Sequence, residues 1–524
     1  MKKNVWLTLL LLVLLFLTAC SSGESASAPP KENSKEDTKE PEKAESTSNE
    51  TFTYASTSDV VGMSPILTND SVSANITEHV FEKLFERNDD TKEIEPRLAE
   101  SFENTDENTW VIKLKEGIKF HDGTPFNAEA VKYTFDKLRD PATAAPRASL
   151  LEPVDTITVI DENTVEIKTK YPYGAFLAAL SHSNAAIVSP TADKELDLMS
   201  NPVGTGPFKF VSWTPGDRVE LEANEEYWDG APALKKVILK VVPEISTAIS
   251  MLQTGEVQFI DNLPTEQIER LEAMDNINIE KKEGTPVYYL TFNHSKEMNQ
   301  DPEFREAVAA AIDRDAFVSK LNGLGVRSDS VIGPEVFGYD ASADNAGTPY
   351  DLEAAKALVQ KNGYADKPIK LLTANRANFV LMAEIVQAQL TEAGFKVDIE
   401  SMEWATFLDT ARAGDYDITF LSWSNVTGDG SELLYPNFHS DNIGSSNRGQ
   451  YNNPEFDELV VQSRTTIDQE ERKVILNQAN QMMIKDNAAV VMYHGIVTAA
   501  MDKAYSGLIL APNGKWSLKD VTGE

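Results

Sequence analysis

Cys20 is the only cysteine among the 524 residues, and this limits how the chain can be stabilised. It ends an apolar run that starts at Val5, just after the positively charged Lys2 and Lys3. A charged start, a short apolar stretch and small residues before a cleavage point are typical of a secretory signal peptide. The run is shorter than the roughly 20 residues of a membrane-spanning helix. We therefore predict an exported protein without structural disulfides, which depends on the size of its hydrophobic core.

The segment Leu17 to Cys20 (Leu-Thr-Ala-Cys) resembles a bacterial lipobox. The resemblance implies that residues 1–19 are removed, that Cys20 is lipidated, and that the protein is anchored on the extracytoplasmic face of the cell membrane. Residues 21–50 contain no large apolar side chain and cannot bury enough surface to fold. We predict that residues 20–50 are a lipidated cysteine followed by a disordered stalk. The alternative is an ordinary signal peptide with a chance cysteine.

Length and composition indicate a soluble, multidomain globular part. Roughly 470 residues follow position 50, which is too long for one hydrophobic core. The chain is 41% hydrophobic and 25% charged, as in ordinary soluble proteins. The formal net charge of −35 argues against a nucleic acid partner, because phosphates would be repelled.

Local signals predict the first helices and strands. Residues 51–56 alternate as in a strand, the segment Asn69-Asp70-Ser71 can cap a helix, and a hairpin spans residues 157–167. A helix from Ile245 should stop at Gly255, a good position for a left-handed cap. These elements belong to a first lobe that is rich in strands.

Helices and strands alternate from residue 351 onwards, which is typical of an α/β lobe. Strands are also expected at 288–293 and 490–493, the second of which returns towards the first lobe. The expected helices and strands between them cover 351–363, 369–373, 379–394, 397–401, 404–414 and 417–423. The predicted fold class is therefore α/β with two lobes, and ligands usually bind such folds where strands end and where domains meet.

The chain contains no recognisable catalytic motif. A nucleophile elbow, a phosphate-binding P-loop and a zinc-protease motif are all missing from the sequence. The six histidines are scattered, and only His439 lies near the candidate site described next. We predict a protein that is not an enzyme and that needs no cofactor or metal.

Several polar and aromatic residues follow strands of the second lobe. Arg376 follows the strand 369–373, and Trp423, Ser424 and Asn425 follow the next expected strand but one. An arginine can bind a carboxylate through two hydrogen bonds, and a tryptophan offers a flat wall with one donor. This set suits a small polar ligand that carries a carboxylate. An equally simple interpretation is that both residues are structural, with Trp423 packed in the core and Arg376 in a surface ion pair.

Five stretches, in order along the chain, resemble family 5 of the bacterial solute-binding proteins, the peptide, glutathione and nickel receptors of ABC importers. They are Pro96–Phe102, Trp110–Phe126, Asn201–Phe208, Asn224–Pro232 and Phe304–Arg314. The resemblance implies two hinged lobes that close on a ligand. It places lobe one at 51–287, with an extra subdomain at 96–218, lobe two at 288–496, and a C-terminal return to lobe one at 497–524.

Residues 421–440 resemble the glutathione and dipeptide branch of that family. In dipeptide receptors an aspartate shortly after the tryptophan binds the amino group of the ligand, but Val426 stands at that position here. The resemblance implies that Arg376 binds a ligand carboxylate and leaves Asp429 as the candidate for an ammonium group. The complete set of predicted ligand-binding residues is Arg376, Trp404, Trp423, Ser424, Asn425, Asp429 and Tyr435.

The first hypothesis is thus a monomeric, lipid-anchored receptor that binds a short peptide, such as a dipeptide, an oligopeptide or glutathione, and delivers it to a membrane permease of the ABC type. A nickel or metal-chelate receptor, with His439 as a ligand, is the alternative within the family. An extracytoplasmic hydrolase and a peptide sensor without transport remain alternatives of other classes.

We expect Arg376→Ala to lower the affinity for a carboxylate ligand sharply, because the ligand carboxylate would be buried without its partner. Calorimetric titration with the ligand that copurifies with the protein measures this. Unchanged affinity would contradict the assignment of Arg376.

Overall fold

The computed structural model describes residues 51–523, apart from the side chains of Ala377, Asn378 and Ala405. The predicted signal peptide, the lipidation at Cys20 and the stalk to residue 50 lie outside the described residues. Within the described part of the chain, no helix is both long and apolar enough to cross a membrane.

A large mixed sheet of eleven strands runs through the described residues. Ten strands form a continuous hydrogen-bonded path, and β13 (Gly325–Val326) pairs with β17 beside it. In spatial order the path is β15 (Lys396–Met402), β14 (Pro368–Ala374), β16 (Ile418–Trp423), β12 (Ile277–Phe292), β17 (Ala489–Asp502), β11 (Phe259–Asp261), β1 (Thr51–Ser56), β10 (Lys236–Val241), β9 (Arg218–Ala223) and β8 (Phe208–Thr214).

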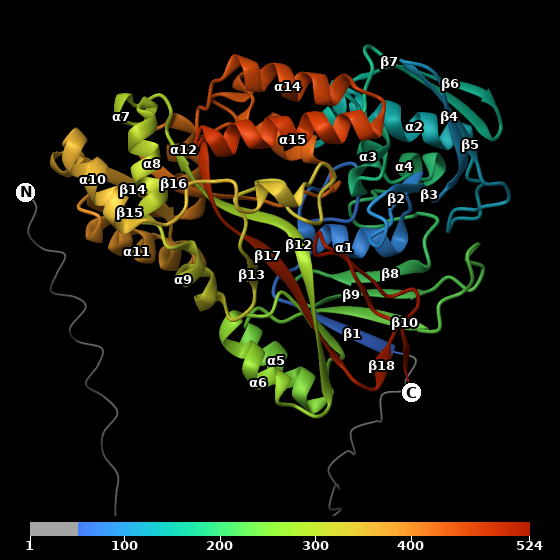
Figure 1. Ribbon diagram of the computed structural model, residues 1–524. Helices are drawn as coiled ribbons and strands as arrows, with labels where there is room; N and C mark the ends of the chain where they lie inside the picture. The colour runs from blue at the N-terminus through green and yellow to red at the C-terminus, as the bar shows by residue number, and fades with distance from the viewer. Residues whose placement is uncertain (1–50, 524) are drawn as a thin grey trace, which may run out of the picture. The chain divides into compact units, whose positions relative to one another are not determined.

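The long strands β12 and β17 are the centre of this sheet and lie side by side in Figure 1. They pair antiparallel from Ile277 opposite Asp502 to Thr291 opposite Ala489. Both strands are longer than the predicted 288–293 and 490–493. In β12, residues 280–283 are charged and show no apolar pattern, and their strand conformation depends on hydrogen bonds to β17.

The predicted alternation of helices and strands in the second half of the chain is confirmed. Strand β14 pairs in parallel with β15 on one side and with β16 on the other. Helices connect these strands along the chain. The helices of this region are α10 (Leu352–Asn362), α11 (Ala377–Glu392) and α12 (Trp404–Ala413).

A separate four-stranded sheet lies in the first half of the chain. Its order is β4 (Ala99–Asp106), β5 (Thr109–Leu114), β7 (Thr164–Thr169) and β6 (Val154–Asp161). Strands β6 and β7 form the predicted hairpin, with Ile157 opposite Ile167 and Val159 opposite Val165.

Further helices and short strands cover these sheets. The helices are α1 (Ser71–Val80), α2 (Ala128–Arg139), α3 (Phe176–Leu180), α4 (Pro190–Glu195), α5 (Ile245–Thr254), α6 (Ile268–Glu272), α7 (Glu297–Gln300), α8 (Pro302–Ala311), α9 (Arg314–Val318), α13 (Gly430–Phe438), α14 (Pro454–Thr465) and α15 (Gln469–Lys485). The short strands are β2 (Phe85–Arg87), β3 (Ile94–Pro96), β18 (Tyr505–Ser506), β19 (Ile509–Leu510), β20 (Trp516–Ser517) and β21 (Thr522–Gly523).

Two large hydrophobic clusters divide the described chain. One contains buried residues between 52 and 259 together with residues between 497 and 521, and we call the elements around it lobe one. The other contains buried residues between 287 and 493, and the elements around it are lobe two. The predicted boundaries at 287 and 496 fall inside β12 and β17, and these boundaries and the range of the extra subdomain stay predictions.

Direct hydrogen bonds join the two lobes away from the central strands. Arg87 Nη2 donates to the carbonyl of Glu335 at 2.8 Å, and Lys92 Nζ donates to the carbonyl of Pro334 at 2.8 Å. The guanidinium of Arg87 also lies 3.6 Å from the carboxylate of Glu335. These contacts hold the lobes together beside the site described below.

The predicted cap at the end of α5 provides a test of the fold. Gly255 has φ +78°, and a Cβ at this position would meet no atom within 4 Å. We expect Gly255→Ala to lower the free energy of unfolding by about 1 to 2 kcal/mol, because only the left-handed backbone conformation opposes the new side chain. Urea unfolding measures this. The neighbouring exposed substitution Thr254→Ala is the control, and equal stability of Gly255→Ala and wild type would contradict the prediction.

Candidate functional site

Three of the predicted site residues meet at one edge of the large sheet. Ala374 and Met402 are paired at the ends of the parallel strands β14 and β15. Arg376 and Trp404 follow these ends by two residues each, and Trp423 is the last residue of the adjacent strand β16. The carboxyl ends of parallel strands are where ligands bind in many α/β proteins.

Arg376 and Trp404 are in direct contact. The guanidinium carbon of Arg376 lies 3.7 Å from the centre of the Trp404 ring, a cation–π arrangement. The Trp404 ring also has apolar neighbours, because it stacks on Phe407 at 5.5 Å and contacts Phe379 at 5.9 Å between ring centres. Arg376 is exposed at the surface, so its guanidinium is both oriented and accessible. Its role as a carboxylate anchor stays a prediction.

Trp423 presents an unused hydrogen-bond donor. Its ring is partly buried and packs against the core of lobe two. Its Nε1 is buried and has no hydrogen-bond partner within residues 51–523. A buried indole N–H without an acceptor is unfavourable, so an acceptor on a ligand would stabilise it.

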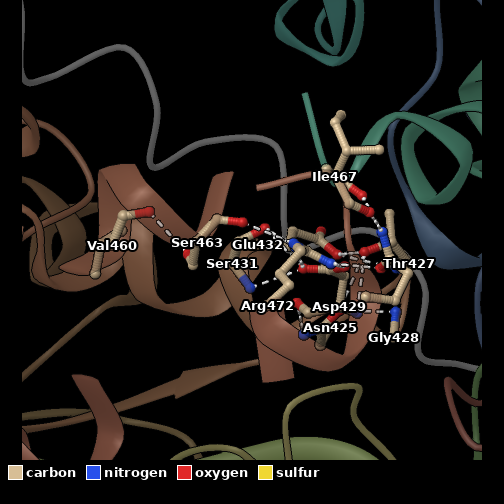
Figure 2. Close-up of polar contacts among 12 residues, drawn as sticks. Asn425, Thr427, Gly428, Asp429, Ser431, Glu432, Val460, Ser463, Ile467 and Arg472 are labelled. Atoms are coloured by element: carbon tan, nitrogen blue, oxygen red, sulfur yellow. Dashed lines mark hydrogen bonds and ion pairs between the residues drawn. The ribbon is translucent and has the colours of Figure 1, made fainter. Parts of the chain in front are cut away.

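Residues 424–429, called the 424–429 loop, continue from β16 into α13, and Asn425 holds the loop from inside. Asn425 Oδ1 accepts the N–H groups of Gly428 at 2.9 Å and Asp429 at 3.2 Å, as Figure 2 shows. Its Nδ2 donates to the carbonyl of Asp429 at 2.7 Å. Asn425 is 1% exposed. In this arrangement Asn425 shapes the loop, whereas the exposed Ser424 borders a cavity.

Asp429 is bound by a buried arginine of the same lobe (Figure 2). Arg472 Nη1 and Nη2 donate to the two carboxylate oxygens at 2.6 Å each, and the Ser431 hydroxyl donates to Oδ1 at 2.7 Å. Burial alone raises the pKa of Asp429, but the charge and hydrogen bonds of Arg472 hold this pKa below its ordinary value. Because both oxygens have partners, an ammonium group would have to compete with Arg472 for this carboxylate, and the role of Asp429 as an ammonium anchor stays a prediction.

Glu432 closes the loop from α13. Its carboxylate accepts the N–H of Thr427 at 2.9 Å and the Thr427 hydroxyl at 2.6 Å. Burial raises the pKa of Glu432, and these hydrogen bonds oppose that rise. The loop is therefore fixed at both ends by side chains of lobe two.

Tyr435 and His439 contact each other, and Tyr435 also contacts Arg464. The guanidinium carbon of Arg464 lies 3.8 Å from the centre of the Tyr435 ring. His439 is 4% exposed, its Nδ1 accepts the N–H of Asp441 at 3.1 Å, and its ring contacts that of Tyr435. No group of three or more His, Cys, Asp or Glu residues suited to a metal ion occurs in the described part of the chain.

Two adjoining polar cavities, of about 230 and 220 Å³, border the 424–429 loop. Both are lined by Val426 of the loop and by Asn513 and Lys515 near the C-terminus. Asn513 Nδ2 donates to the carbonyl of Val426 at 3.3 Å, which connects the two sides. We call these two cavities together the polar cavity. Arg376, Trp404, Asp429 and Tyr435 do not line it.

The lobe-one wall of the polar cavity holds four polar side chains that the sequence did not predict as site residues. Each of them has a buried atom without a hydrogen-bond partner in the region the structure covers. These atoms are Asp70 Oδ2, Asn75 Oδ1, His182 Nε2 and Ser183 Oγ. Buried polar groups are nearly always paired in proteins, so four unpaired ones around one cavity make it a candidate binding site.

The protonation of His182 follows from its contacts. Its Nδ1 accepts the N–H of Asn184 at 3.1 Å, so in the neutral ring Nε2 carries the proton and is a donor. Burial lowers the pKa of His182 well below its ordinary value, and the nearby positive charges of Lys515 and Arg147 lower it further. The ring is therefore neutral at physiological pH.

Lys515 belongs to a chain of partly buried charges. Glu78 accepts from Lys515 at 2.7 Å and from Lys83 at 2.5 Å. Burial raises the pKa of Glu78, but the two lysines hold it well below its ordinary value. This chain is satisfied within the protein, in contrast to Asp70 and its neighbours.

Only one residue of the lobe-one wall carried a signal in the sequence. The sequence predicts a helix cap within residues 69–71, and Asp70 is the residue whose Oδ1 accepts the N–H of Ser73, at 2.8 Å. A capping signal does not indicate the role of the second oxygen. Asn75, His182 and Ser183 come from segments about 100 residues apart, and no local pattern brings them together.

Comparison with known proteins agrees with this architecture. The model of the family "Bacterial extracellular solute-binding proteins, family 5 Middle" matches residues 93–445. The chain is 28% identical to heme-binding protein A of Haemophilus influenzae, with 98% of each chain covered. It is 30% identical to the probable D,D-dipeptide-binding periplasmic protein DdpA of Escherichia coli, over 86% of this chain and 89% of that one.

A solved structure also matches. The periplasmic binding protein DppA of Helicobacter pylori, in complex with the peptide STSA, superimposes with a TM-score of 0.76 at 26% identity, over 90% of this chain and 98% of that one. These matches confirm the predicted two-lobed α/β fold of the periplasmic binding protein type.

The Asp429–Arg472 pair gives a test of the loop's support. We expect Asp429→Ala and Arg472→Met each to lower the free energy of unfolding by about 3 to 5 kcal/mol, because each leaves one buried charge unpaired. The double variant should lose clearly less than the sum, because it leaves no buried charge alone. Urea unfolding of the three variants measures this.

The exposed pair of Glu353 and Lys356, 2.9 Å apart, provides the control. Glu353→Ala should change stability by no more than about 0.5 kcal/mol. Additive losses in the double variant, or losses below about 1 kcal/mol in the single variants, would show that the pair does not support the loop.

Proposed function

Because the chain belongs to family 5 of the bacterial extracellular solute-binding proteins, we propose that it is a receptor for a short peptide, which it delivers to an ABC importer. The peptide is a dipeptide, an oligopeptide or a glutathione-like molecule. The receptor acts as a monomer without catalysis. A lipid on Cys20 anchors it outside the cytoplasmic membrane, and residues 21–50 tether it near the permease.

The unpaired polar atoms of the polar cavity carry this proposal. Asp70 Oδ2 and Asn75 Oδ1 are acceptors, whereas His182 Nε2 and Ser183 Oγ are donors. A bound molecule that offers both donors and acceptors would pair all four. Peptides have this property, because each carries an ammonium group, amide groups and a carboxylate.

The charges of the cavity walls indicate how the two ends of the peptide are oriented. The carboxylate of Asp70 suits the ammonium end, with Asn75 Oδ1 as a second acceptor. The carboxylate end, or a carbonyl, suits the donor His182 Nε2 and the guanidinium of Arg147, which also lines the cavity. Arg147 is oriented by its Nε, which donates to Asn69 Oδ1 at 2.8 Å.

This assignment accounts for Val426. The loop of lobe two offers no side-chain charge at the position where dipeptide receptors carry an aspartate. In our proposal Asp70 of lobe one supplies the negative charge, and Ser424 and Val426 close the cavity from the other lobe. Arg376, Trp404 and Trp423 remain the predicted contacts for the part of the peptide that extends along the edge of the sheet.

A metal-chelate receptor is the alternative function within this family. Experiments must distinguish it from the proposed peptide receptor. One relative is named for heme binding and is 28% identical over nearly the whole chain. Native mass spectrometry and metal analysis of the purified protein distinguish the two. A copurified peptide supports the proposal, whereas stoichiometric metal or heme would overturn it.

We expect Asp70→Asn to weaken the binding of an unmodified peptide at least tenfold, because the ammonium group loses its counter-charge while the helix cap is kept. The N-acetylated form of the same peptide should bind both proteins equally. Isothermal titration calorimetry with dialanine, the tetrapeptide Ser-Thr-Ser-Ala and glutathione measures these affinities.

Asp351→Asn is the matched control, because Asp351 is also a helix-capping aspartate, with its side chain bound to the N–H of Ala354 at 2.9 Å. It should leave peptide binding unchanged. Equal peptide affinity of Asp70→Asn and Asp351→Asn would show that Asp70 does not bind the ligand. Uptake of labelled peptide by cells separates transport from sensing.

A further inference from the structure

A third cavity borders the other end of the 424–429 loop. It has a volume of about 570 Å³, and residues 427–429 form one of its walls. Lobe one contributes Phe102, Trp110 and Leu177, and lobe two contributes Phe337, Tyr339 and Ile467. We call it the aromatic cavity. Its walls come from both lobes, so it exists as a closed space only while the lobes are together.

The aromatic cavity is separate from the polar cavity. No residue that lines it lines the polar cavity as well. Arg87 fills the space between them, because a Cβ on Gly428 would lie only 2.8 Å from Arg87 Nε. Arg87 is fixed there by its hydrogen bond to the carbonyl of Glu335.

The shape and lining of this cavity suit a small organic molecule. Binding pockets for such molecules are typically of roughly 300 to 1,000 Å³, lined by apolar and aromatic side chains with a few polar groups. Trp110 is 5% exposed and contacts Phe176 and Phe102 at 5.1 and 6.1 Å between ring centres. Its Nε1 is buried and finds no hydrogen-bond acceptor among residues 51–523. One acceptor on the bound molecule would satisfy it.

The charged side chains in the walls already have partners, except for Glu93, which is exposed to water. Lys92 Nζ lies 3.2 Å from the Glu335 carboxylate, and Lys473 Nζ lies 2.7 Å from that of Glu470. Asp429 is neutralised within lobe two, as described above. A charged ligand would have to displace one of these partners, so an uncharged ligand is favoured.

We propose that the aromatic cavity is a second binding site, for a small uncharged aromatic molecule with one hydrogen-bond acceptor directed at Trp110 Nε1. The molecule contacts both lobes and therefore stabilises their closed arrangement. This site does not depend on the peptide-binding function proposed above.

Prodan, an uncharged naphthalene ketone whose fluorescence shifts to the blue in apolar surroundings, is a suitable probe. We expect saturable one-site binding to the wild-type protein and a rise in its melting temperature, because the ligand binds only the folded form. Ala178→Trp, which fills the cavity from α3, should weaken binding at least tenfold. Ile467→Trp fills the cavity from lobe two and should weaken prodan binding to a similar extent, so the test does not rest on one variant.

Trp110→Phe keeps the ring but removes the N–H, and it should weaken prodan binding several-fold. Val211→Trp places a tryptophan on an exposed position of β8 and is the control for an added indole. Asp70→Asn should leave prodan binding unchanged, which separates this proposal from the peptide site.

Three outcomes would overturn the proposal. They are binding that does not saturate, unchanged binding in folded Ala178→Trp and Ile467→Trp, and displacement of prodan by a peptide that the protein binds. The last result would assign the aromatic cavity to the peptide ligand itself.

Discussion

The buried ion pair of Asp429 and Arg472 is the interaction on which the geometry of the site depends. It connects the start of α13 to α15, and Arg472 is 1% exposed in its side chain. Removing both charges from water is costly. The two short hydrogen bonds between them, the hydroxyl and N–H of Ser431, and the carbonyl of Ser463 compensate for this cost. Because the 424–429 loop ends at this pair and borders both the polar and the aromatic cavity, the position of Asp429 determines a wall of each.

The same requirement for pairing distinguishes structural from recognition residues. Lys83, Glu78 and Lys515 form a partly buried chain of charges that is complete without a ligand. The partly buried Asp70 and the buried His182 line the same cavity, and each has a buried atom that is unpaired in the described structure. A group that is already paired loses energy when a ligand competes for it, whereas an unpaired one gains a partner. Recognition therefore falls to the unpaired groups, even though the paired ones carry more charge.

Local features were predictable from the sequence, and distant pairings were not. The helix cap within residues 69–71, the stop at Gly255 and the strands at 369–373 and 397–401 all follow from patterns of a few residues. The partner of Asp429 lies 43 residues further along the chain, and nothing in either local pattern indicates the contact. The family resemblance drew attention to Asp429 by its position near the tryptophan, but position does not show whether a carboxylate is already neutralised.

Because Val426 carries no charge, the two lobes contribute differently to ligand binding. Its only polar group towards the polar cavity is its carbonyl, which already accepts from Asn513. In the proposed function lobe two thus contributes shape, and lobe one contributes charge through Asp70 and Arg147. A peptide then binds first to lobe one, where charge attracts it, and lobe two closes over it.

Closure must also re-form the contacts of Arg87 and Lys92 with residues 334–335. These contacts hold charged groups near water, where salt weakens them. The affinity of such a receptor would therefore depend on salt through closure as well as through the charges that meet the ligand.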